Sequence, residues 1–370
     1  MRLGINGWRI HGNRTGVGRY LHNIVRCWTP DFTRGAFDSI RFYSHRELPP
    51  GELPVEHKRL GPEMRMLLWE NLRFGPSADD DVLWCPSFSR PLMARGRTVV
   101  TVYEATLALY PDYFPRNHFL SLPEVYLPIY RWSARNASLV LTTTNAAKND
   151  IMKAFGVPES KIRSAPLAPA PEFVPVRDQQ ALRAIREKYL GGDVPYFLFV
   201  GKLTPRRNVP MLMEAFAQIA AKVPHRLIVA GMNTTGFPLA AHAERLGISD
   251  RFVHAGFVPD EDLLLLYNAA DCFVLPYTYE ALSLTTMEAQ AVGVPVITTD
   301  VPGLRETTGG HAILMPEASA RHIAESMLRI AGDRALHAKL CEEGYGFMRQ
   351  FNWERTARVT LDVLEEAARL

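Results

Sequence analysis

The stretch CFVLPYTYEALSLTTMEAQAVGVPVIT, residues 272–298, decides the fold class. It opens with an apolar run at 272–275, continues into a helical stretch from about Ser283, and closes with a second apolar run at 296–298. A strand, a helix and a strand in this order are typical of a βα unit on a parallel sheet. The stretch therefore predicts an α/β protein.

The same alternation of short β-branched or aromatic runs with helical stretches occurs in both halves of the chain. Helices are expected over residues 16–28, 62–72 and 145–155 of the first half. The predicted strands are 3–6, 40–43, 82–84, 99–102 and 139–143 in the first half, and 197–200, 227–230, 252–255, 272–275 and 296–298 in the second. We therefore expect two sheets of similar size.

A proline-rich stretch separates the two halves. Residues 165–176, APLAPAPEFVPV, contain four prolines and cannot form a helix or a central strand. We interpret this stretch as a linker between two doubly wound domains, 1–170 and 176–350, that face a central cleft. Because ligands of such sheets bind at the carboxyl ends of the strands, the functional residues are expected there.

Composition excludes several classes of protein. With 370 residues, 47% hydrophobic, 22% charged and 10% aromatic, the chain is not disordered, collagen-like or a small disulfide-stapled fold. Neither a membrane-spanning stretch nor a secretory leader is recognisable, so we expect a cytoplasmic protein. The cysteines are widely spaced and are expected to be reduced and structural: Cys27, Cys85, Cys272 and Cys341.

Charge is distributed unevenly between the halves. Residues 1–185 hold 24 basic and 17 acidic side chains, a net +7, whereas the remainder holds 18 and 22, a net −4. A basic first half suits an anionic partner such as a charged lipid surface or a phosphorylated acceptor. The alternative is that scattered surface arginines only keep the protein soluble.

Two glutamates stand out in the quoted stretch, with seven residues between them. Glu280 is expected on the loop after the strand, and Glu288 about a turn and a half inside the helix. The two carboxylates can hold different hydroxyl-bearing parts of one ligand, while amide groups at the helix start point at a phosphate between them. The alternative is an acidic helix start that is favoured by the helix dipole.

A basic loop follows the first strand of the second half. In VGKLTPRRN, residues 200–208, a strand ends at Gly201, and Lys202, Arg206 and Arg207 follow it. Such cations suit a diphosphate, because Lys supplies a point charge and Arg a planar fork that grips phosphate oxygens. A solvated basic loop is the alternative, and the spacing does not match a P-loop.

Two further features lie in the first half. Residues 11–20, HGNRTGVGRY, resemble a dinucleotide fingerprint but lack its third glycine, so only Gly16 and Gly18 are expected to let backbone approach a ligand. The sequence Asp79–Asp81 contains D-x-D, a candidate metal site. We interpret it as a solvated turn before a strand.

Taken in order, the motifs are those of a known family. The chain resembles, from end to end, the retaining glycosyltransferases of family 4, which have the GT-B fold and use nucleotide-sugar donors. The matching segments are RTGVGRY (14–20), DVLWCPSFSRP (81–91), YPDYFP (110–115), GVPESKI (156–162), VGKLTPRRNV (200–209), HAGFVPDEDLLLLYNAAD (254–271), the Glu280–Glu288 segment and FNWERTA (351–357).

The resemblance implies roles for individual residues. Positions matching Lys202 and Arg207 bind the donor diphosphate in the family, Glu280 holds sugar hydroxyls, and Glu288 takes the ribose hydroxyls. The resemblance also implies that basic residues and the helix start replace a metal, that no cofactor is needed, and that a helix at 353–370 packs back on the first domain. The remaining donor-binding positions that it implies are Gly16, Gly18, Gly201, Phe257 and Val258, with the amides of Leu282, Ser283 and Leu284.

The chain also departs from the family pattern. The loop at 281–285 is less glycine-rich than in many relatives. Tyr103 and Glu104 stand where the family has His-Asp, and that His approaches the reacting sugar. We expect Tyr103 and Glu104 to belong to the catalytic site, with altered sugar preference or altered activity.

The expected function is transfer of a hexose from a nucleoside diphosphate to a sugar hydroxyl, with retained anomeric configuration. Mannose from GDP-mannose is the first expectation, because RTGVGRY and YPDYFP resemble mannosyltransferases of bacterial surface polysaccharide and lipopolysaccharide assembly. The partners would be the nucleotide sugar, a glycan or lipid-linked acceptor, and an anionic membrane surface on the inner face of the plasma membrane, but no nucleic acid. Two alternatives stay open: a nucleotide-sugar 2-epimerase, and a catalytically degenerate nucleotide-sugar-binding subunit of an assembly complex.

Overall fold

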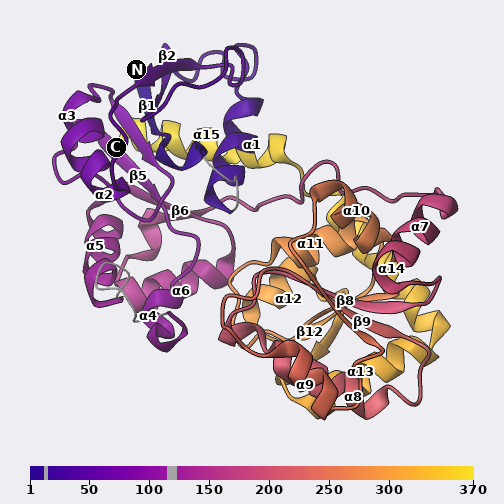
Figure 1. The fold of residues 1–370 in the computed structure, drawn as a ribbon. Helices are drawn as coiled ribbons and strands as arrows, with labels where there is room; N and C mark the ends of the chain where they lie inside the picture. Colours follow the sequence, from indigo (N-terminus) through magenta and orange to yellow (C-terminus); the bar gives the residue numbers. More distant parts are fainter. Residues whose placement is uncertain (12–15, 115–122) are drawn as a thin grey trace. The chain divides into compact units, whose positions relative to one another are not determined.

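A computed structural model describes residues 1–11, 16–114 and 123–370. The chain forms two compact units, each described here by itself (Figure 1). Unit 1 consists of residues 1–167 together with the chain end, 351–370. Unit 2 is residues 168–350. The unit boundary falls within the proline-rich stretch, and no helix or strand lies between Ser164 and Gln179.

Unit 1 is built on a parallel sheet of seven strands in the order β3-β2-β1-β4-β5-β6-β7. The chain starts in the centre of the sheet, moves to one edge and then crosses to the other, which is the doubly wound arrangement. The strands are β1 (Arg2–Asn6), β2 (Ser39–Ser44), β3 (Glu56–Arg59), β4 (Val82–Cys85), β5 (Arg97–Thr101), β6 (Leu139–Thr142) and β7 (Ile162–Ser164).

Unit 2 repeats the design with six parallel strands in the order β10-β9-β8-β11-β12-β13. Helices α8, α9 and α13 lie together on one side of this sheet, and α7, α10, α11 and α14 on the other (Figure 1). The strands are β8 (Tyr196–Val200), β9 (Arg226–Ala230), β10 (Phe252–Gly256), β11 (Cys272–Leu275), β12 (Val296–Thr299) and β13 (Ile313–Met315).

The helices alternate with the strands, and the last of them returns to the first unit. Helix α15 (Trp353–Arg369) contacts α1, β4, β5 and β6 of unit 1. Apart from short 3₁₀ turns, the other described helices of unit 1 are α1 (Val17–Cys27), α2 (Met66–Trp69), a π-helix (Glu70–Phe74), α3 (Gly75–Ser77), α4 (Thr106–Leu109), α5 (Pro123–Asn136) and α6 (Asn145–Phe155). Those of unit 2 are α7 (Gln179–Leu190), α8 (Val209–Ile219), α9 (Leu239–Arg245), α10 (Asp260–Ala269), α11 (Leu284–Ala291), α12 (Pro302–Thr308), α13 (Ala320–Gly332) and α14 (Arg334–Met348).

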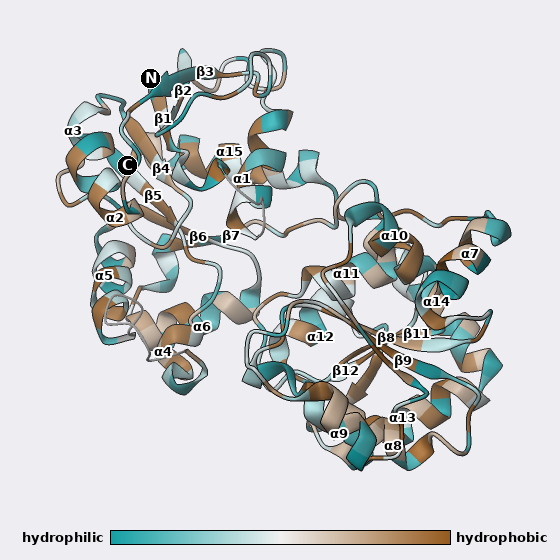
Figure 2. Cartoon of the chain, viewed as in Figure 1, coloured by the Kyte–Doolittle hydropathy of each residue, from teal (hydrophilic) through white to brown (hydrophobic). Residues whose placement is uncertain are grey.

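Both cores are dominated by apolar strands covered on two faces. Strands β4, β8 and β11 are buried at every residue, as strands between two helical layers must be. Figure 2 shows the strands largely in brown, while the helices carry teal on their outer sides. Burial of these runs is the main driving force for each unit.

The ten predicted strands are all confirmed, with ends that differ by at most two residues. The predicted helix 62–72 is wrong in detail, because residues 66–77 form a short α-turn, a π-turn and a second short α-turn. Three edge strands were not predicted. β3 (EHKR) and β7 (IRS) have no apolar run, whereas β13 (ILM) has a short one that the sequence analysis did not recognise.

Candidate functional site

Three neighbouring strands of unit 2 reach glycine at their carboxyl ends. Gly201 follows β8, Gly231 follows β9 and Gly256 ends β10, all with positive φ. The backbones here are in close contact: a Cβ atom on Gly231 would lie 2.1 Å from the Gly201 carbonyl oxygen, and the Gly231 amide donates to the Gly256 carbonyl at 2.7 Å. Gly256, in contrast, leaves open space beside its Cα. The sheet edge therefore offers exposed backbone to a ligand. Sequence reasoning missed Gly231, whose signal is its place directly after the apolar run of β9.

Arg207 lies against this glycine edge. A Cβ atom on Gly201 would be 1.9 Å from Arg207 Nη1, so only glycine leaves room for the guanidinium. The guanidinium carbon sits 5.1 Å from the centre of the Tyr277 ring, an arrangement that orients the fork. Tyr277 lies two residues after the end of β11, and β11 is the strand next to β8.

The polar atoms of this group lack protein partners. Nε and Nη1 of Arg207, the hydroxyl of Tyr277 and the hydroxyl of Thr204 are buried, and none has a hydrogen-bond partner among the described residues. Burial raises the pKa of Tyr277 more than nearby Arg207 lowers it, so the phenol stays a neutral donor. Buried donors without acceptors are costly, and a ligand rich in acceptor oxygens, such as a phosphate, would satisfy them.

The two arginines of the basic loop differ in environment. Arg206 faces Glu280, with Nη1 3.6 Å from a carboxylate oxygen, whereas Arg207 has no carboxylate partner among the described residues. Lys202 is exposed to solvent next to Gly201. The cation of the loop that lies against the sheet edge without a carboxylate partner among the described residues is therefore Arg207, and Lys202 is an exposed charge beside it.

Helix α12 packs against the backbone of the loop that carries Glu280. Glu280 and Ala281 are buried, and a Cβ atom on Gly303 would lie 2.1 Å from the Glu280 carbonyl oxygen. On the other side, the Thr278 amide donates to the Arg206 carbonyl at 3.2 Å. These contacts fix the backbone of Glu280. A residue that binds a ligand in one orientation needs such support.

Glu288 is buried within α11, where the Tyr267 hydroxyl donates to its carboxylate at 3.2 Å. Burial and the adjacent carboxylate both raise the pKa of Tyr267, which keeps that hydroxyl protonated.

Ser283 is the N-cap of α11, and its hydroxyl accepts from the Thr286 amide at 3.3 Å. The amides at Leu284 and Thr285 have no intrahelical carbonyl to bind, so the helix start can receive an anion.

Phe257 and Val258 follow β10 and differ in exposure. Phe257 is 73% exposed and Val258 is buried. The exposed ring, next to the open side of Gly256, has a free face for stacking. The resemblance implied only that backbone at these two positions meets the base of the donor. The structure adds that the Phe257 side chain is itself exposed.

The remaining predicted residues belong to unit 1. Gly16 starts α1 with φ of +52°, and Gly18 is buried in the first turn of that helix. Part of the surrounding motif, residues 12–15, and Pro115 of YPDYFP lie outside the described residues. The glycine conformation at Gly16 fits a tight entry into the helix.

Tyr103 and Glu104 follow β5 of unit 1 and already have protein partners. The Tyr103 hydroxyl donates to the Pro86 carbonyl at 2.9 Å, and its ring packs edge-on against Tyr20 with centroids 5.2 Å apart. Burial raises the pKa of Tyr103 well above its usual value, so the side chain is neutral. Glu104 accepts from the Thr106 hydroxyl at 2.7 Å.

The interpretation of Asp79–Asp81 as a solvated turn is wrong for Asp80. That side chain is buried, and it accepts from the Tyr43 hydroxyl at 2.8 Å. Asp79 pairs with Arg2 at 3.0 Å and with Arg41 at 2.9 Å. Through these bonds, Asp79 and Asp80 connect strands β1 and β2 to the segment that precedes β4.

The comparisons with known proteins agree with this geometry. The family model described as "Glycosyl transferases group 1" matches residues 183–347. Among solved structures, the fold is similar to sucrose-phosphate synthase from Thermosynechococcus elongatus, with a TM-score of 0.72, 20% identity and 96% of each chain covered. It is also similar to Anabaena Alr3699/HepE in complex with UDP-glucose, with a TM-score of 0.75, 17% identity and full coverage of both chains. The fold of the chain is therefore the GT-B fold.

The chain is also similar in sequence to bacterial sugar-transferring proteins. It is 26% identical to O-antigen chain mannosyltransferase B of Escherichia coli, over 72% of this chain and 69% of that protein. It is 28% identical to mannosylfructose-phosphate synthase of Agrobacterium fabrum, over 62% of this chain and 53% of that protein. The aligned part thus spans about half to two thirds of these relatives. The chain thus has the GT-B fold, matches the group 1 glycosyl transferase model over residues 183–347, and is similar in sequence to a bacterial mannosyltransferase.

The contact between α12 and the Glu280 loop can be tested by Gly303→Ala. The added methyl group would overlap the Glu280 carbonyl oxygen, and overpacking of this kind lowers the free energy of unfolding by about 1–3 kcal/mol. The matched control is Gly346→Ala in α14, where the same methyl group meets open space and raises helix stability by up to about 1 kcal/mol. Urea unfolding of both variants measures the difference. Equal stability of the two variants would contradict the close contact.

Proposed function

We propose that this protein transfers a hexose from a nucleoside diphosphate sugar to a hydroxyl of a glycan or glycolipid acceptor, with retained anomeric configuration and without a metal ion. The observation that carries the proposal is that two buried nitrogen atoms of Arg207, Nε and Nη1, have no partner among the described residues at the glycine edge of the unit 2 sheet. Further support comes from Anabaena Alr3699/HepE, a protein of the same fold whose structures hold UDP and UDP-glucose.

In this proposal the residues of unit 2 divide the donor between them. Arg207, Lys202 and the amides of Leu282, Ser283 and Leu284, around the start of α11, bind the diphosphate. Glu288 takes the ribose hydroxyls and Glu280 the hydroxyls of the hexose. The base lies by Phe257 and Val258. Charge on the leaving diphosphate is then offset by fixed cations and amide dipoles rather than by a divalent ion.

The donor is proposed to be GDP-mannose, and the product a bacterial surface polysaccharide or glycolipid. Support comes from relatives whose names include mannosyltransferase: O-antigen chain mannosyltransferase B, and serotype-specific mannosyltransferase WbdA of Escherichia coli, which is 22% identical over 61% of this chain and 28% of that protein. We also propose membership of the retaining family 4, action in the cytoplasm where nucleotide sugars are made, and peripheral contact with the inner face of the plasma membrane. None of the described helices is long and apolar enough to cross a membrane.

Tyr103 and Glu104 are assigned to the catalytic site on the acceptor side, together with Gly16 and Gly18. Because the Tyr103 hydroxyl donates its hydrogen to the Pro86 carbonyl, it can only accept a hydrogen bond from a sugar hydroxyl. A neutral phenol also cannot balance positive charge at the anomeric carbon. We therefore assign Tyr103 to orientation of the sugar.

One observation favours a second function. The partners of Tyr103 and Glu104 within unit 1 are those of purely structural residues. If they have no other role, the chain would be a nucleotide-sugar-binding subunit that does not catalyse transfer.

Incubation with a panel of nucleotide sugars and candidate acceptors tests the proposal. We expect acceptor-dependent release of free nucleoside diphosphate, greatest with GDP-mannose, unchanged by EDTA, and a product whose anomeric configuration by NMR equals that of the donor. Loss of activity in EDTA with recovery in magnesium would contradict the metal-free site. Tight binding of a nucleotide sugar without turnover on any acceptor would establish the second function instead.

The division of roles between the two glutamates predicts different losses in two variants. Glu288→Gln should weaken binding of the bare nucleoside diphosphate about 10- to 100-fold, because a charged hydrogen bond to ribose is worth about 1.5–3 kcal/mol. Glu280→Gln should leave that binding unchanged and weaken binding of the intact donor. Calorimetric titration with both ligands measures this, with exposed Glu342→Gln on α14 as the matched control. Equal losses for both ligands in both variants would overturn the assignment.

A further inference from the structure

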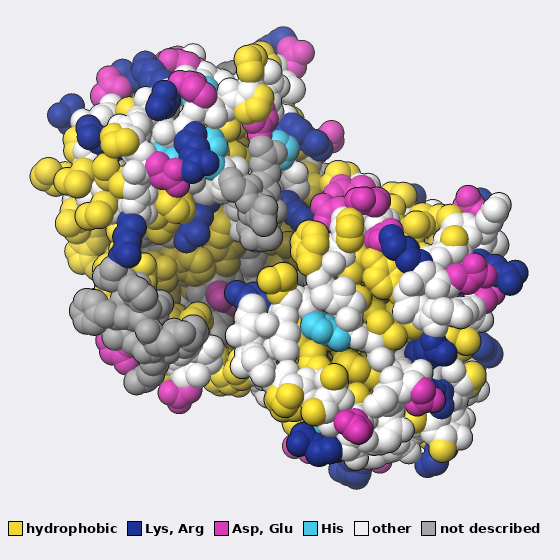
Figure 3. Space-filling view, in the orientation of Figure 1, with side chains coloured by type: hydrophobic (Ala, Val, Ile, Leu, Met, Phe, Trp, Pro, Cys, Tyr) yellow, Lys and Arg dark blue, Asp and Glu magenta, His cyan; other side chains and the backbone are white. Residues whose placement is uncertain are grey.

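Glu70 is a buried acidic residue of unit 1 that has no part in the donor site. Figure 3 shows acidic side chains at the surface of both units, where ionisable groups usually lie. Glu70, in contrast, is fully buried, and it is the first residue of the π-helix. A π-turn inside a helix is rare and frequently occurs at a functional site. A buried carboxyl group at the start of one therefore calls for a physical explanation.

Glu70 lies between the two central strands of the unit 1 sheet. Its Oε1 atom accepts from Nδ2 of Asn6, the last residue of β1, at 3.0 Å. Burial and, second, the charge of Glu70 raise the pKa of the thiol of Cys85, the last residue of β4. β1 and β4 are neighbours, and the chain proceeds from them toward opposite edges of the sheet. Ligands of doubly wound sheets bind at the carboxyl ends of such a pair.

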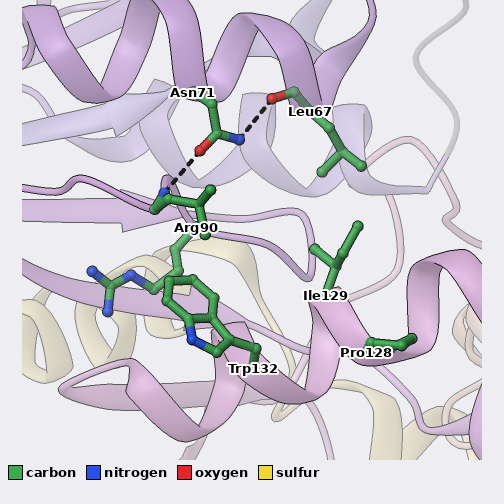
Figure 4. A pocket seen from close by; sticks show the side chains of 7 residues that line it. Leu67, Asn71, Arg90, Pro128, Ile129 and Trp132 are labelled. Carbon is green, nitrogen blue, oxygen red and sulfur yellow. Dashed lines mark hydrogen bonds between the residues drawn. The ribbon is translucent and has the colours of Figure 1, made fainter.

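The start of the π-helix is fixed to the loop that follows β4. The Asn71 side chain donates to the Leu67 carbonyl and accepts from the Leu92 amide, both at 2.8 Å (Figure 4). Arg90, from the same loop, lies against Trp132 of α5, with its guanidinium carbon 5.3 Å from the ring centre (Figure 4). These contacts hold the backbone that carries the buried carboxyl group.

Asn6 connects Glu70 to the segment after β1, residues 7–11, which we call the β1 turn. The Asn6 Oδ1 atom accepts from the Trp8 amide at 3.2 Å, so the two ends of one side-chain amide bind the carboxylate and the turn. The Trp8 indole donates to the Met64 carbonyl at 3.1 Å, which ties the turn to the segment before α2. The carboxylate of Glu70 thus orients the Asn6 amide, and that amide orients the β1 turn.

The β1 turn carries an exposed cation. Arg9 lies over the Trp8 ring, with its guanidinium carbon 5.4 Å from the ring centre. Burial raises the pKa values of Tyr103 and Tyr130, and the charge of Arg9 opposes this rise at both phenols. Arg9 is therefore close to Tyr103, the residue proposed to orient the sugar.

The carboxyl group of Glu70 is more than a packing element. A neutral amide could also accept from Asn6, but Glu70 can ionise: burial raises its pKa to about 7, while nearby groups favour the charged form. The groups that face it are Asn6, Cys85, Ser89, Arg90 and Tyr130. Arg90 is the charged member of this set, since burial keeps the thiol and the phenol protonated. The Oε2 atom has no hydrogen-bond partner among the described residues.

The two protonation states of Glu70 hold Asn6 with different strength. A carboxylate is the stronger acceptor, because hydrogen bonds to charged groups contribute about twice as much as neutral ones. The fold favours the opposite state. Because the folded protein binds this proton more tightly than the unfolded chain, stability falls as pH rises from about 4.5 to about 7. A charge that lowers stability and strengthens the hold on the β1 turn indicates a role in function.

We propose that Glu70 is a positioning residue for the transfer reaction, which fixes Asn6 and thereby the β1 turn that holds Arg9 beside Tyr103. The inference rests on the proposed function for its effect on transfer. It concerns unit 1, whereas the nucleoside diphosphate is proposed to bind unit 2. A Glu70 variant should therefore change transfer without changing the binding of bare nucleotide.

Nuclear magnetic resonance of nitrogen-15-labelled tryptophan tests the positioning without turnover. The Trp8 indole signal, identified by its loss in Trp8→Phe, should move with pH with a midpoint near 7. That movement should be absent from Glu70→Gln and present in the control Glu342→Gln, an exposed position on α14. An equal movement in Glu70→Gln, or no movement with this midpoint in the wild type, would overturn the proposal. This result decides the positioning even if the protein transfers no sugar, so failure of the proposed function is distinguishable.

Transfer kinetics test the effect on the reaction. Glu70→Gln should lower kcat about tenfold at pH 8, the difference between a charged and a neutral hydrogen bond, and should abolish a rise in kcat with a midpoint near pH 7. Its Kd for the nucleoside diphosphate should equal that of the wild type, and its urea midpoint at pH 8 should be equal or higher. Asn6→Ser should cause a similar loss, and the double variant should lose no more than the larger single loss. An unchanged pH profile, additive losses or a fall in kcat matched by a lower urea midpoint would overturn the proposal.

Discussion

Arg207 lies over Gly201 with two buried nitrogen atoms that no described residue satisfies, and much of unit 2 serves this arrangement. The position requires glycine at 201, because any side chain there would meet the guanidinium. The Tyr277 ring lies beside the Arg207 guanidinium, and this contact depends on β8 and β11 being neighbouring strands. A buried donor without an acceptor costs free energy in the unliganded protein. Donors that are already fixed in place need no rearrangement when a ligand binds, and such a site is called preorganised.

The two glutamates are held by different means around that cation. Glu288 is rigid because it belongs to a helix and accepts from Tyr267, whereas Glu280 is rigid because Gly303 allows α12 to press on its backbone. Arg206 pairs with Glu280, which leaves Arg207 as the cation without a carboxylate among the described residues. Two arginines that are adjacent in sequence therefore differ in environment: Arg206 faces a carboxylate, and Arg207 faces none among the described residues.

Much of this was accessible from sequence, because central parallel strands are long apolar runs and their carboxyl ends carry the functional residues. The strands, the helix that begins after Ser283 and the proximity of Glu280 to the basic loop follow from those two regularities. What escaped depends on contacts distant in sequence: the pairing of Arg206 rather than Arg207, the burial of Asp80 against Tyr43, and the role of Gly231.

The central claim is that Arg207 and the start of α11 form a diphosphate site. It is tested most directly by a crystal structure of the protein with a bound nucleoside diphosphate. The account predicts phosphate oxygens within hydrogen-bond distance of Arg207 Nε or Nη1 and of the amides at Leu284 or Thr285, with the base beside Phe257. A nucleotide bound elsewhere, with the Arg207 nitrogen atoms still unpaired, would contradict it.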